Sequence, residues 1–597
     1  MHAATRHRGP DDEGFFESDA VSFAQNRLSI IDLSPGGRQP MDSADGRYTV
    51  VFNGEIYNYR ELKAELEQKG FAFRSQSDTE VLLAAFSAWG DACLPRLNGM
   101  FAFAVWDRER RELFLARDSF GIKPLYFTAE SGRFAFSSEA RSLLAFGASR
   151  DVDPEAVGLF FRFLYVPGPR TIWKHIQKLS PGHWLRIVPG GEPRIVRCWK
   201  PQEGEAIADR AQATELVRSG VEAAVRRQLV SDRPLGVFLS GGIDSTIVAG
   251  LVAQASSVPV RTFSIGYEAT EQAAKYNADA DLAERTAKRF GAIHERIDVA
   301  GGQVADAFER IVAAMDEPVS NHVQPSTYFL AQLAKPRITV ALGGDGADEL
   351  FGGYARYWLS RRIDRWRWLE MAFGWTGAPE FAGRLSGVPS LAAKLKTRPG
   401  VERHLAFLGE KGGDVERLLR PGVASDGAAA VAFAPWYAEA WRDPTNQFMA
   451  VDAQTWLPDE SLIRSDRLTM AHGLEQRVPF LDAELAALAY RIPSRFKLDR
   501  RDLGKRVLRD AFADLLTPEI ANQPKRGFFS PAAKWLRGDL LPVARELLSD
   551  GYVQGTDAYV DLAQARAMLD AHVAKRGYHL NAVWAALTFQ AWWKANI

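Results

Sequence analysis

Short apolar runs separated by turn residues fill the first part of the chain. They are rich in β-branched and aromatic residues and lie at 48–52, 101–106, 112–116, 124–127 and 133–137. This pattern predicts antiparallel strands. Two helices are predicted between them, because Asn58 with Glu61 and Ser77 with Glu80 have the spacing of a capping box. We therefore expect one α+β domain over residues 1–205.

From about residue 205 the pattern changes to strand–loop–helix units. Apolar runs are each followed by a helical pattern, at 234–239 and 244–255, at 260–265 and 281–290, and at 338–342 and 348–354. Such alternation is typical of a parallel, doubly wound sheet. After residue 358 the pattern is mostly helical and rich in tryptophan, and its role stays open. We expect an α/β domain with a helical extension over residues 206–597.

Composition narrows the range of partners. Lys and Arg number 74 and so do Asp and Glu, which gives no strong attraction to nucleic acid or to an anionic membrane. Apolar stretches stop well short of the ~20 residues of a membrane span, and the first residues have no signal-peptide character. The two cysteines favour a reducing compartment. We expect a cytoplasmic protein with small-molecule substrates, and we leave its oligomeric state open, a homodimer included.

The string SGGIDS, residues 240–245, connects an apolar strand to a helix. Glycines let a phosphate approach the backbone, and the first amides of the helix attract anions. The hydroxyls of Ser240 and Ser245 would add donors, whereas the sequence contains no Walker string. Taken alone, the string is equally consistent with an ordinary tight turn.

A second string, LGGDGADELFGGY at 342–354, places Asp345, Asp348 and Glu349 after another β-run. Open α/β sheets bind ligands at this end of their strands. Carboxylates beside a pyrophosphate indicate Mg²⁺, a hard cation that takes oxygen ligands. The alternative is a solvated helix start, where acidic residues are also common.

These strings resemble those of glutamine-dependent asparagine synthetase of the bacterial B type. The resemblance continues through DRLTMAHGLEQRVPFLD at 466–482, KRGF at 525–528 and WLRG at 535–538. It begins in the first domain with RHRGPDDEG at 6–14, RLSIID at 27–32, FNGEIYN at 52–58 and SDTE at 77–80. The order is that of the family over nearly the whole chain. It implies a layered αββα glutaminase-like domain followed by an ATP-pyrophosphatase domain.

The resemblance implies that ATP adenylates the β-carboxylate of aspartate and that ammonia then displaces AMP. It assigns ATP binding to Leu239, Ser240, Gly241, Gly242, Asp244, Ser245, Ile265, Gly343 and Gly344. It assigns Mg²⁺ to Asp244 and Asp348. Lys525 would contact the phosphates, and Asp345 is the candidate base for incoming ammonium, a role that Asp348 or Glu349 could contest.

Two further arginines belong to these strings or lie beside them. Arg464 stands where many relatives carry lysine, and we expect substitution to be tolerated there. Arg477 either pairs with Glu475 for structural reasons, which we favour, or faces the substrate.

The glutaminase-like domain keeps a glutamine pocket by resemblance. Arg27 would bind the α-carboxylate, Asn53 and Gly54 would form an oxyanion hole, and Glu55 and Asp78 would hold the α-amino group. The family's nucleophile is a cysteine directly after the initiator methionine, but His2 stands there, and Cys93 is expected to serve packing. Either the true start lies upstream, which we favour, or the enzyme uses free ammonia. The printed chain should be ammonia-dependent.

Two other functions stay open. A related amide-forming synthetase, such as a macrocyclase or a β-lactam-forming enzyme, would not need the retained FNGEIYN and SDTE strings. A nonenzymatic scaffold would not need SGGIDS or GGDGADE. Pyrophosphate release that depends on aspartate separates the first from asparagine synthesis, and failure to bind Mg-ATP would favour the second.

Overall fold

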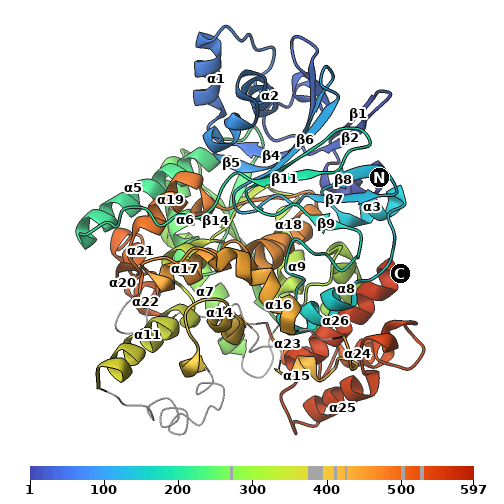
Figure 1. Ribbon diagram of the computed structural model, residues 1–597. Coiled ribbons are helices and arrows are strands. Elements are labelled where there is room, and N and C mark those ends of the chain that lie inside the picture. Colours follow the sequence, from blue (N-terminus) through green and yellow to red (C-terminus); the bar gives the residue numbers. More distant parts are fainter. Residues whose placement is uncertain (269–272, 374–393, 409–412, 424–425, 499–503, 525–529) are drawn as a thin grey trace.

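The computed structural model describes residues 1–268, 273–373, 394–408, 413–423, 426–498, 504–524 and 530–597 (Figure 1). Figure 1 shows the antiparallel strands, in blue and cyan, above the later helices. Lys525 and the KRGF string that it begins, both singled out in the sequence, lie outside the described residues.

A six-stranded antiparallel sheet organises the first part of the chain. Its order is β11(Arg194–Arg197), β10(His183–Ile187), β6(Glu112–Arg117), β5(Gly99–Asp107), β4(Tyr48–Ile56) and β3(Met41–Asp42). Alternate residues of β5 enter two different cores, since side chains of a strand point to opposite faces. Phe101, Phe103 and Val105 pack with the helices, whereas Ala104 and Trp106 pack with β7(Tyr126–Glu130) and neighbouring elements.

Smaller elements surround this sheet. A three-stranded sheet runs β8(Arg133–Ser137), β7, β9(Gln177–Lys178), and a hairpin pairs β1(Asp12–Glu17) with β2(Ser22–Arg27). The helices of this part are α1(Tyr59–Gln68), α2(Asp78–Trp89), α3(Ala140–Phe146) and α4(Pro154–Phe163), with short 3₁₀ segments η1(His2–Arg8), η2(Pro35–Gly37) and η3(Gly90–Arg96). The predicted strands are confirmed, with boundaries shifted by a few residues.

The second part contains the predicted parallel sheet. Its order is β14(Ile293–Val299), β13(Arg261–Tyr267), β12(Leu235–Phe238), β15(Val340–Leu342) and β16(Glu475–Arg477), and every described pairing is parallel. The helices that alternate with its strands are α5(Arg210–Gln228), α6(Ile243–Ala255), α7(Ala273–Arg289), α8(Gly301–Ala314), α9(Gln324–Ala334) and α10(Ala347–Phe351).

The helical extension follows α10. It comprises α11(Ala355–Phe373), α14(Val401–Leu408), α15(Gly413–Glu416), α16(Asp426–Phe433), η5(Ala434–Tyr437), α17(Pro444–Asp452), the π-helix η6(Leu457–Leu462), α18(Ile463–Met470), η7(Pro479–Leu481), α19(Ala483–Arg491), α20(Ser494–Lys497), α21(Arg506–Ala511), α22(Pro518–Asn522), α23(Ala532–Trp535), α24(Leu541–Leu547), η8(Thr556–Ala558), α25(Leu562–Val573) and α26(Leu580–Asn596). The predicted mostly helical character of this region is confirmed.

One predicted local feature is wrong. Asn58 precedes α1 but makes no side-chain cap, because its amide bonds instead to the backbone of Arg96 and Asn98. Ser77 does cap α2 by accepting from Thr79 N, while Glu80 accepts from the backbone of Arg74 and Ser75 rather than closing a box.

Candidate active site

The two turns singled out in the sequence meet at the carboxyl edge of the parallel sheet. Because β12 and β15 are neighbours, the turns that follow them lie side by side. A Cβ added to Gly344 would lie 2.7 Å from Asp244 Cβ and 3.2 Å from Ser245 N. The acidic turn therefore packs directly on the serine–glycine turn, and only a glycine fits at residue 344.

The serine–glycine turn is held open at the start of α6. Gly241 has φ +69°, and a Cβ there would come 2.6 Å from Asp279 O. Gly242 precedes α6 without a side-chain cap. The Ser240 and Ser245 hydroxyls lie 3.0 Å apart and hydrogen bond to each other, so they brace the turn. A cleft of about 120 Å³ lies against it, lined by Ser240, Gly242 and Asp244 from this side.

Lys505 was not predicted, although it lines this cleft. Its Nζ is 2.5 Å from Asp244 Oδ2 and 2.6 Å from Asp348 Oδ1, so one ammonium joins the two proposed magnesium ligands. A Cβ on Gly504 would come 2.1 Å from Gly352 O. Gly504 therefore lets this segment lie on the acidic turn and brings Lys505 to the carboxylates.

The carboxylate of Asp345 contacts a second group of residues. Its Oδ2 accepts from Gln476 Nε2 at 2.6 Å, and its Oδ1 accepts from Ser461 Oγ at 3.2 Å. Arg464 donates to Glu460 at 3.2 Å. Burial alone would lower the pKa of Arg464, but the charges of Glu460 and Asp345 raise it. Ser461 belongs to η6, and π-helical turns occur often at functional sites.

Glu349, the rival base, has a different environment. Its side chain is buried and accepts from Tyr354 Oη at 3.0 Å. Burial, and then the charge of Asp348, raise its pKa to about 8. At neutral pH Glu349 therefore tends to hold a proton, whereas Asp345 accepts two donors as a carboxylate does. This difference favours Asp345 over Glu349 as the base.

The remaining predicted ATP residues lie at the same sheet edge. Leu239 directly follows β12, Ile265 lies within β13, and Gly343 follows β15. Leu239 and Ile265 are buried. The predicted role of each in nucleotide binding stays a prediction, as does that of Lys525.

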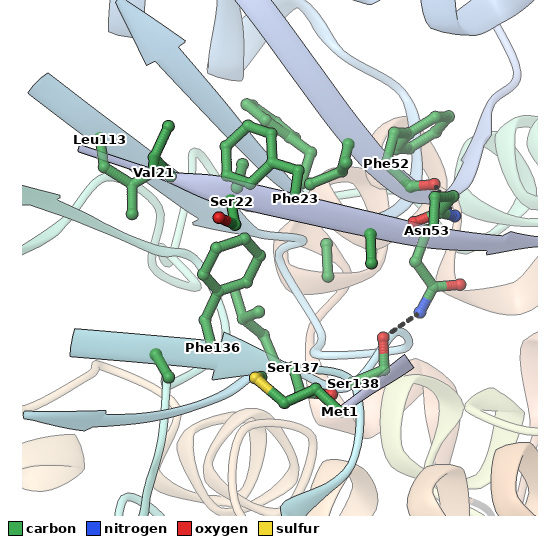
Figure 2. Close-up of a pocket in the computed structure, with 18 of the residues that line it drawn as sticks. Met1, Val21, Ser22, Phe23, Phe52, Asn53, Leu113, Phe136, Ser137 and Ser138 are labelled. Carbon is green, nitrogen blue, oxygen red and sulfur yellow. Dashed lines mark hydrogen bonds between the residues drawn. The ribbon is translucent and has the colours of Figure 1, made fainter. Parts of the chain in front are cut away.

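The predicted glutamine residues all line one cavity of about 1010 Å³ in the antiparallel part: Arg27, Asn53, Gly54, Glu55 and Asp78. Figure 2 shows Phe23 and Phe136 next to each other in its lining, where their rings pack edge to face with centroids 5.8 Å apart, and Asn53 reaching Ser138. Asn53 Nδ2 donates to Ser138 Oγ at 3.2 Å. Asn53 and Gly54 lie within β4, which excludes the simple turn that their sequence also allows.

Arg27 and Gly54 show how this cavity is shaped. The Arg27 guanidinium is buried and donates to the carbonyls of Ile31 at 3.1 Å and Asp32 at 2.6 Å. Gly54 has φ +146°, and a Cβ there would come 2.0 Å from Met100 O. Only glycine can therefore adopt this backbone conformation and fit in this space in β4.

Two buried carboxyls of the cavity are difficult to ionise. Burial raises the pKa of Asp78 to about 6, even though Asp78 accepts from Ile56 N at 2.9 Å. Burial also raises the pKa of Glu55 well above its ordinary value, against the charge of Arg477. Glu55 Oε1 lies 3.4 Å from Arg477 Nη2. A ligand cation would be a favourable partner for such carboxyls.

Arg477 makes the ion pair with Glu475 that the structural interpretation predicts. It is fully buried and lies 3.0 Å from Glu475, and it also pairs with Glu55, one of the residues that line the cavity.

The cysteines do not supply a nucleophile to the cavity. Both lie within the described residues, and neither lines it. Burial raises the pKa of Cys93 to about 12 and that of Cys198 to about 11, which disfavours the reactive thiolate. Cys93 lies in η3 and is fully buried, in keeping with a packing role.

Comparison with known families matches residues 216–594 to the asparagine synthase family and residues 1–197 to the glutamine amidotransferase domain. The chain belongs to the asparagine synthase family. Asparagine synthetase [glutamine-hydrolyzing] 1 of Bacillus subtilis is 32% identical over 100% of this chain and 93% of that protein. A putative asparagine synthetase [glutamine-hydrolyzing] of Mycobacterium tuberculosis is 35% identical over 98% of this chain and 92% of its own length. Amidase chry2 of Gibberella zeae is 28% identical over 94% and 89%.

Among solved structures, glutamine phosphoribosylpyrophosphate amidotransferase of Bacillus subtilis matches with a TM-score of 0.27 and 15% identity, over 49% of this chain and 76% of that one.

A search of the described residues finds no helix both long and apolar enough to cross a membrane.

Proposed function

We propose that this chain synthesises asparagine from aspartate, ATP and the nitrogen of ammonia or glutamine. ATP would adenylate the β-carboxylate and release pyrophosphate, after which ammonia would displace AMP. The contact of Gly344 with Asp244 is the observation that carries this proposal, since it joins a phosphate-binding turn to an acidic turn. Membership of the asparagine synthase family supports it.

The residues present fit a magnesium ion together with a nucleotide. Asp244 and Asp348 already converge on one cation, the Lys505 ammonium. Among the described residues no group of three or more acidic, histidine or cysteine side chains could hold a metal alone, so phosphate oxygens and water would complete the coordination. Magnesium, when bound, would neutralise charge on the phosphates. The turn at 240–245 would bind those phosphates, and Leu239, Ile265, Gly343 and Gly344 would border the nucleoside.

In the second step, Asp345 would accept a proton from incoming ammonium. The nitrogen then forms a bond to the β-carbonyl carbon, and the bond from that carbon to the phosphate oxygen breaks, so AMP leaves with the electron pair. The nitrogen, still carrying one proton more than the neutral amide, releases that proton to solvent water. Lys525 is proposed to stabilise the phosphate charge of the first step. Its predicted position on a loop between Pro524 and Gly527 would suit closure over a substrate.

The cavity in the antiparallel part is proposed to bind glutamine. Arg27 would meet the α-carboxylate, Glu55 and Asp78 the α-ammonium, and Asn53 with the Gly54 amide the developing oxyanion. Since neither cysteine lines this cavity, the chain as printed should use ammonia and should not hydrolyse glutamine.

Measuring pyrophosphate, AMP and asparagine together tests the proposal. Aspartate, Mg-ATP and ammonium should yield the three products in equal amounts, while glutamine in place of ammonium should yield no asparagine. Pyrophosphate release with another acyl substrate but not with aspartate would indicate the related amide-forming class. Failure to bind Mg-ATP would indicate a scaffold. Glutamine hydrolysis would contradict the nucleophile argument.

We propose four further properties of the whole chain. The antiparallel part is a layered αββα domain, supported by the two separate cores on the faces of β5. The division between domains lies at residue 205, in the interval between the two family matches. A cytoplasmic location and a homodimeric state are to be tested by fractionation and light scattering.

A further inference from the structure

Gln476 occupies a tightly fixed position beside Asp345. Its backbone belongs to β16, whose neighbour Arg477 is opposite Leu342 of β15. The carbonyl of Arg477 accepts from Gly343 N at 2.8 Å. The Arg477 guanidinium donates to the carbonyls of Gln228 at 2.9 Å and Val230 at 2.6 Å. These bonds hold the short strand to the sheet and to the segment after α5.

Alternation along β16 turns Gln476 toward the acidic turn. Glu475 and Arg477 face Lys123 and Glu55, and Glu475 lines the glutamine cavity. Gln476, between them, faces the other way and donates to Asp345 Oδ2 at 2.6 Å. A Cβ on Gly343 would come 2.6 Å from Gln476 Nε2, so the contact also requires glycine on the facing strand end.

We propose that Gln476 is a positioning residue for the amide-forming step, which it serves by fixing the carboxylate of Asp345. This inference rests on the proposed function, in which Asp345 takes the proton of ammonium. Gln476 Nε2 holds one oxygen of Asp345 and Ser461 Oγ restrains the other. The carboxylate is thereby aimed in one direction instead of turning toward the cations around it. A base must be oriented within hydrogen-bond reach of the proton that it takes.

Charged groups from several elements lie around Asp345, so its carboxylate has other partners toward which it could turn. Arg464 of α18 interacts electrostatically with it, next to Glu460 of η6. Asp348 and Glu349 follow on α10, and Asp244 with Lys505 lies across Gly344. Without the Gln476 amide, Asp345 could turn to Arg464 and be lost as a base.

Two substitutions of Gln476 give the test. Gln476→Met keeps the length of the side chain but removes the donor, and Gln476→Glu places a second carboxylate against Asp345. We expect Gln476→Met to lose less in adenylate formation, measured as aspartate-dependent exchange of pyrophosphate into ATP, than in the amide-forming step. Ammonia-dependent kcat/KM should fall roughly tenfold to a hundredfold in Gln476→Met, the size expected for one hydrogen bond to a charged group, and further in Gln476→Glu.

Hydroxylamine as the nucleophile distinguishes positioning of the base from a merely structural role. A structural defect would lower activity equally with hydroxylamine and with ammonia. Hydroxylamine arrives mostly neutral near pH 8, whereas ammonia arrives mostly as ammonium, so hydroxylamine needs less help from a base. The loss in Gln476→Met should therefore be several times smaller with hydroxylamine, measured as aspartyl hydroxamate. Ser461→Ala removes the longer of the two hydrogen bonds to Asp345. It should show a smaller loss with ammonia, again reduced with hydroxylamine, and it replaces the Gln476 variants in the test if these do not fold.

Gln564→Met, on the exposed face of α25, is the matched control and should behave as wild type. Wild-type ammonia kinetics in Gln476→Met, or an equal loss with both nucleophiles, would overturn the inference. If the wild-type chain itself shows no aspartate-dependent pyrophosphate exchange, the proposed function fails instead, and the two failures are thus distinguished.

Discussion

Lys505 joins Asp244 and Asp348 with a single ammonium that is almost entirely buried. Both carboxylates are themselves mostly covered, at 14% and 11% side-chain exposure. Removing one partner from a buried ionic group costs about 3–5 kcal/mol, because the remaining charges lose their compensation. Substitution of Lys505 therefore tests whether the carboxylates of Asp244 and Asp348 can also bind a divalent cation.

We predict that Lys505→Met lowers the melting temperature in magnesium-free buffer and that Mg²⁺ restores part of the loss. The gain with Mg²⁺ should be larger in the variant than in wild type, since the cation would replace the missing ammonium. Thermal unfolding with and without Mg²⁺ measures this, with the exposed Lys288→Met as control. An equal response to Mg²⁺ in all three proteins would argue against a metal at these carboxylates.

Asp78 makes stability depend on pH. Burial raises its pKa from 3.8 to about 6, so between these values the folded chain keeps a proton that the unfolded chain releases. This contribution to stability is complete below pH 3.8 and is lost as pH rises through 6, by at most about 3 kcal/mol. Asp78→Asn should remove that part of the decline. Urea unfolding at pH 4.5 and 7 measures it, and parallel pH slopes in variant and wild type would contradict it.

At the scale of elements, the two turns depend on a glycine at their contact. Gly344→Ala would place a methyl 2.7 Å from Asp244 Cβ, and neither neighbour is the flexible end of a side chain. We expect the turns to separate and Mg-ATP affinity to fall at least tenfold, measured by calorimetry. Gly302→Ala, in α8 with nothing within 4 Å of the added Cβ, should bind as wild type. Unchanged affinity in Gly344→Ala would mean that this contact does not shape the site.

The elements also show what a sequence can predict. Continuous apolar runs indicate β5 and β6 directly, because both faces of these strands are buried. The sequence analysis missed β14 because this largely uncovered edge strand has the polar sequence IHERIDV. It missed β16 because three residues, EQR, are too few to show a periodic pattern of apolar residues. Asp244 and Asp345 follow from local strings. Lys505 and Gln476 do not, because their partners lie 261 and 131 positions away.

At the scale of the whole molecule, α18 ties the antiparallel part to the parallel sheet. Arg467 is fully buried, donates to Ser138 O at 2.7 Å and pairs with Glu139 at 3.2 Å. Ser138 also accepts from Asn53 in the cavity proposed to bind glutamine, and the same helix carries Arg464 beside Asp345. A single helix thus contacts the surroundings of both candidate sites.

We predict that Arg467→Met destabilises this junction by about 3–5 kcal/mol, because Glu139 and nearby Asp316 lose a buried counter-charge. The loss falls where the two parts meet, so the antiparallel part should unfold at a lower temperature than the parallel part, giving two calorimetric transitions. Arg285→Met removes an exposed pair with Glu519 and should melt like wild type. One transition at the wild-type temperature in Arg467→Met would show that the junction is held elsewhere, for instance by Arg8 with Asp466, 2.7 Å apart.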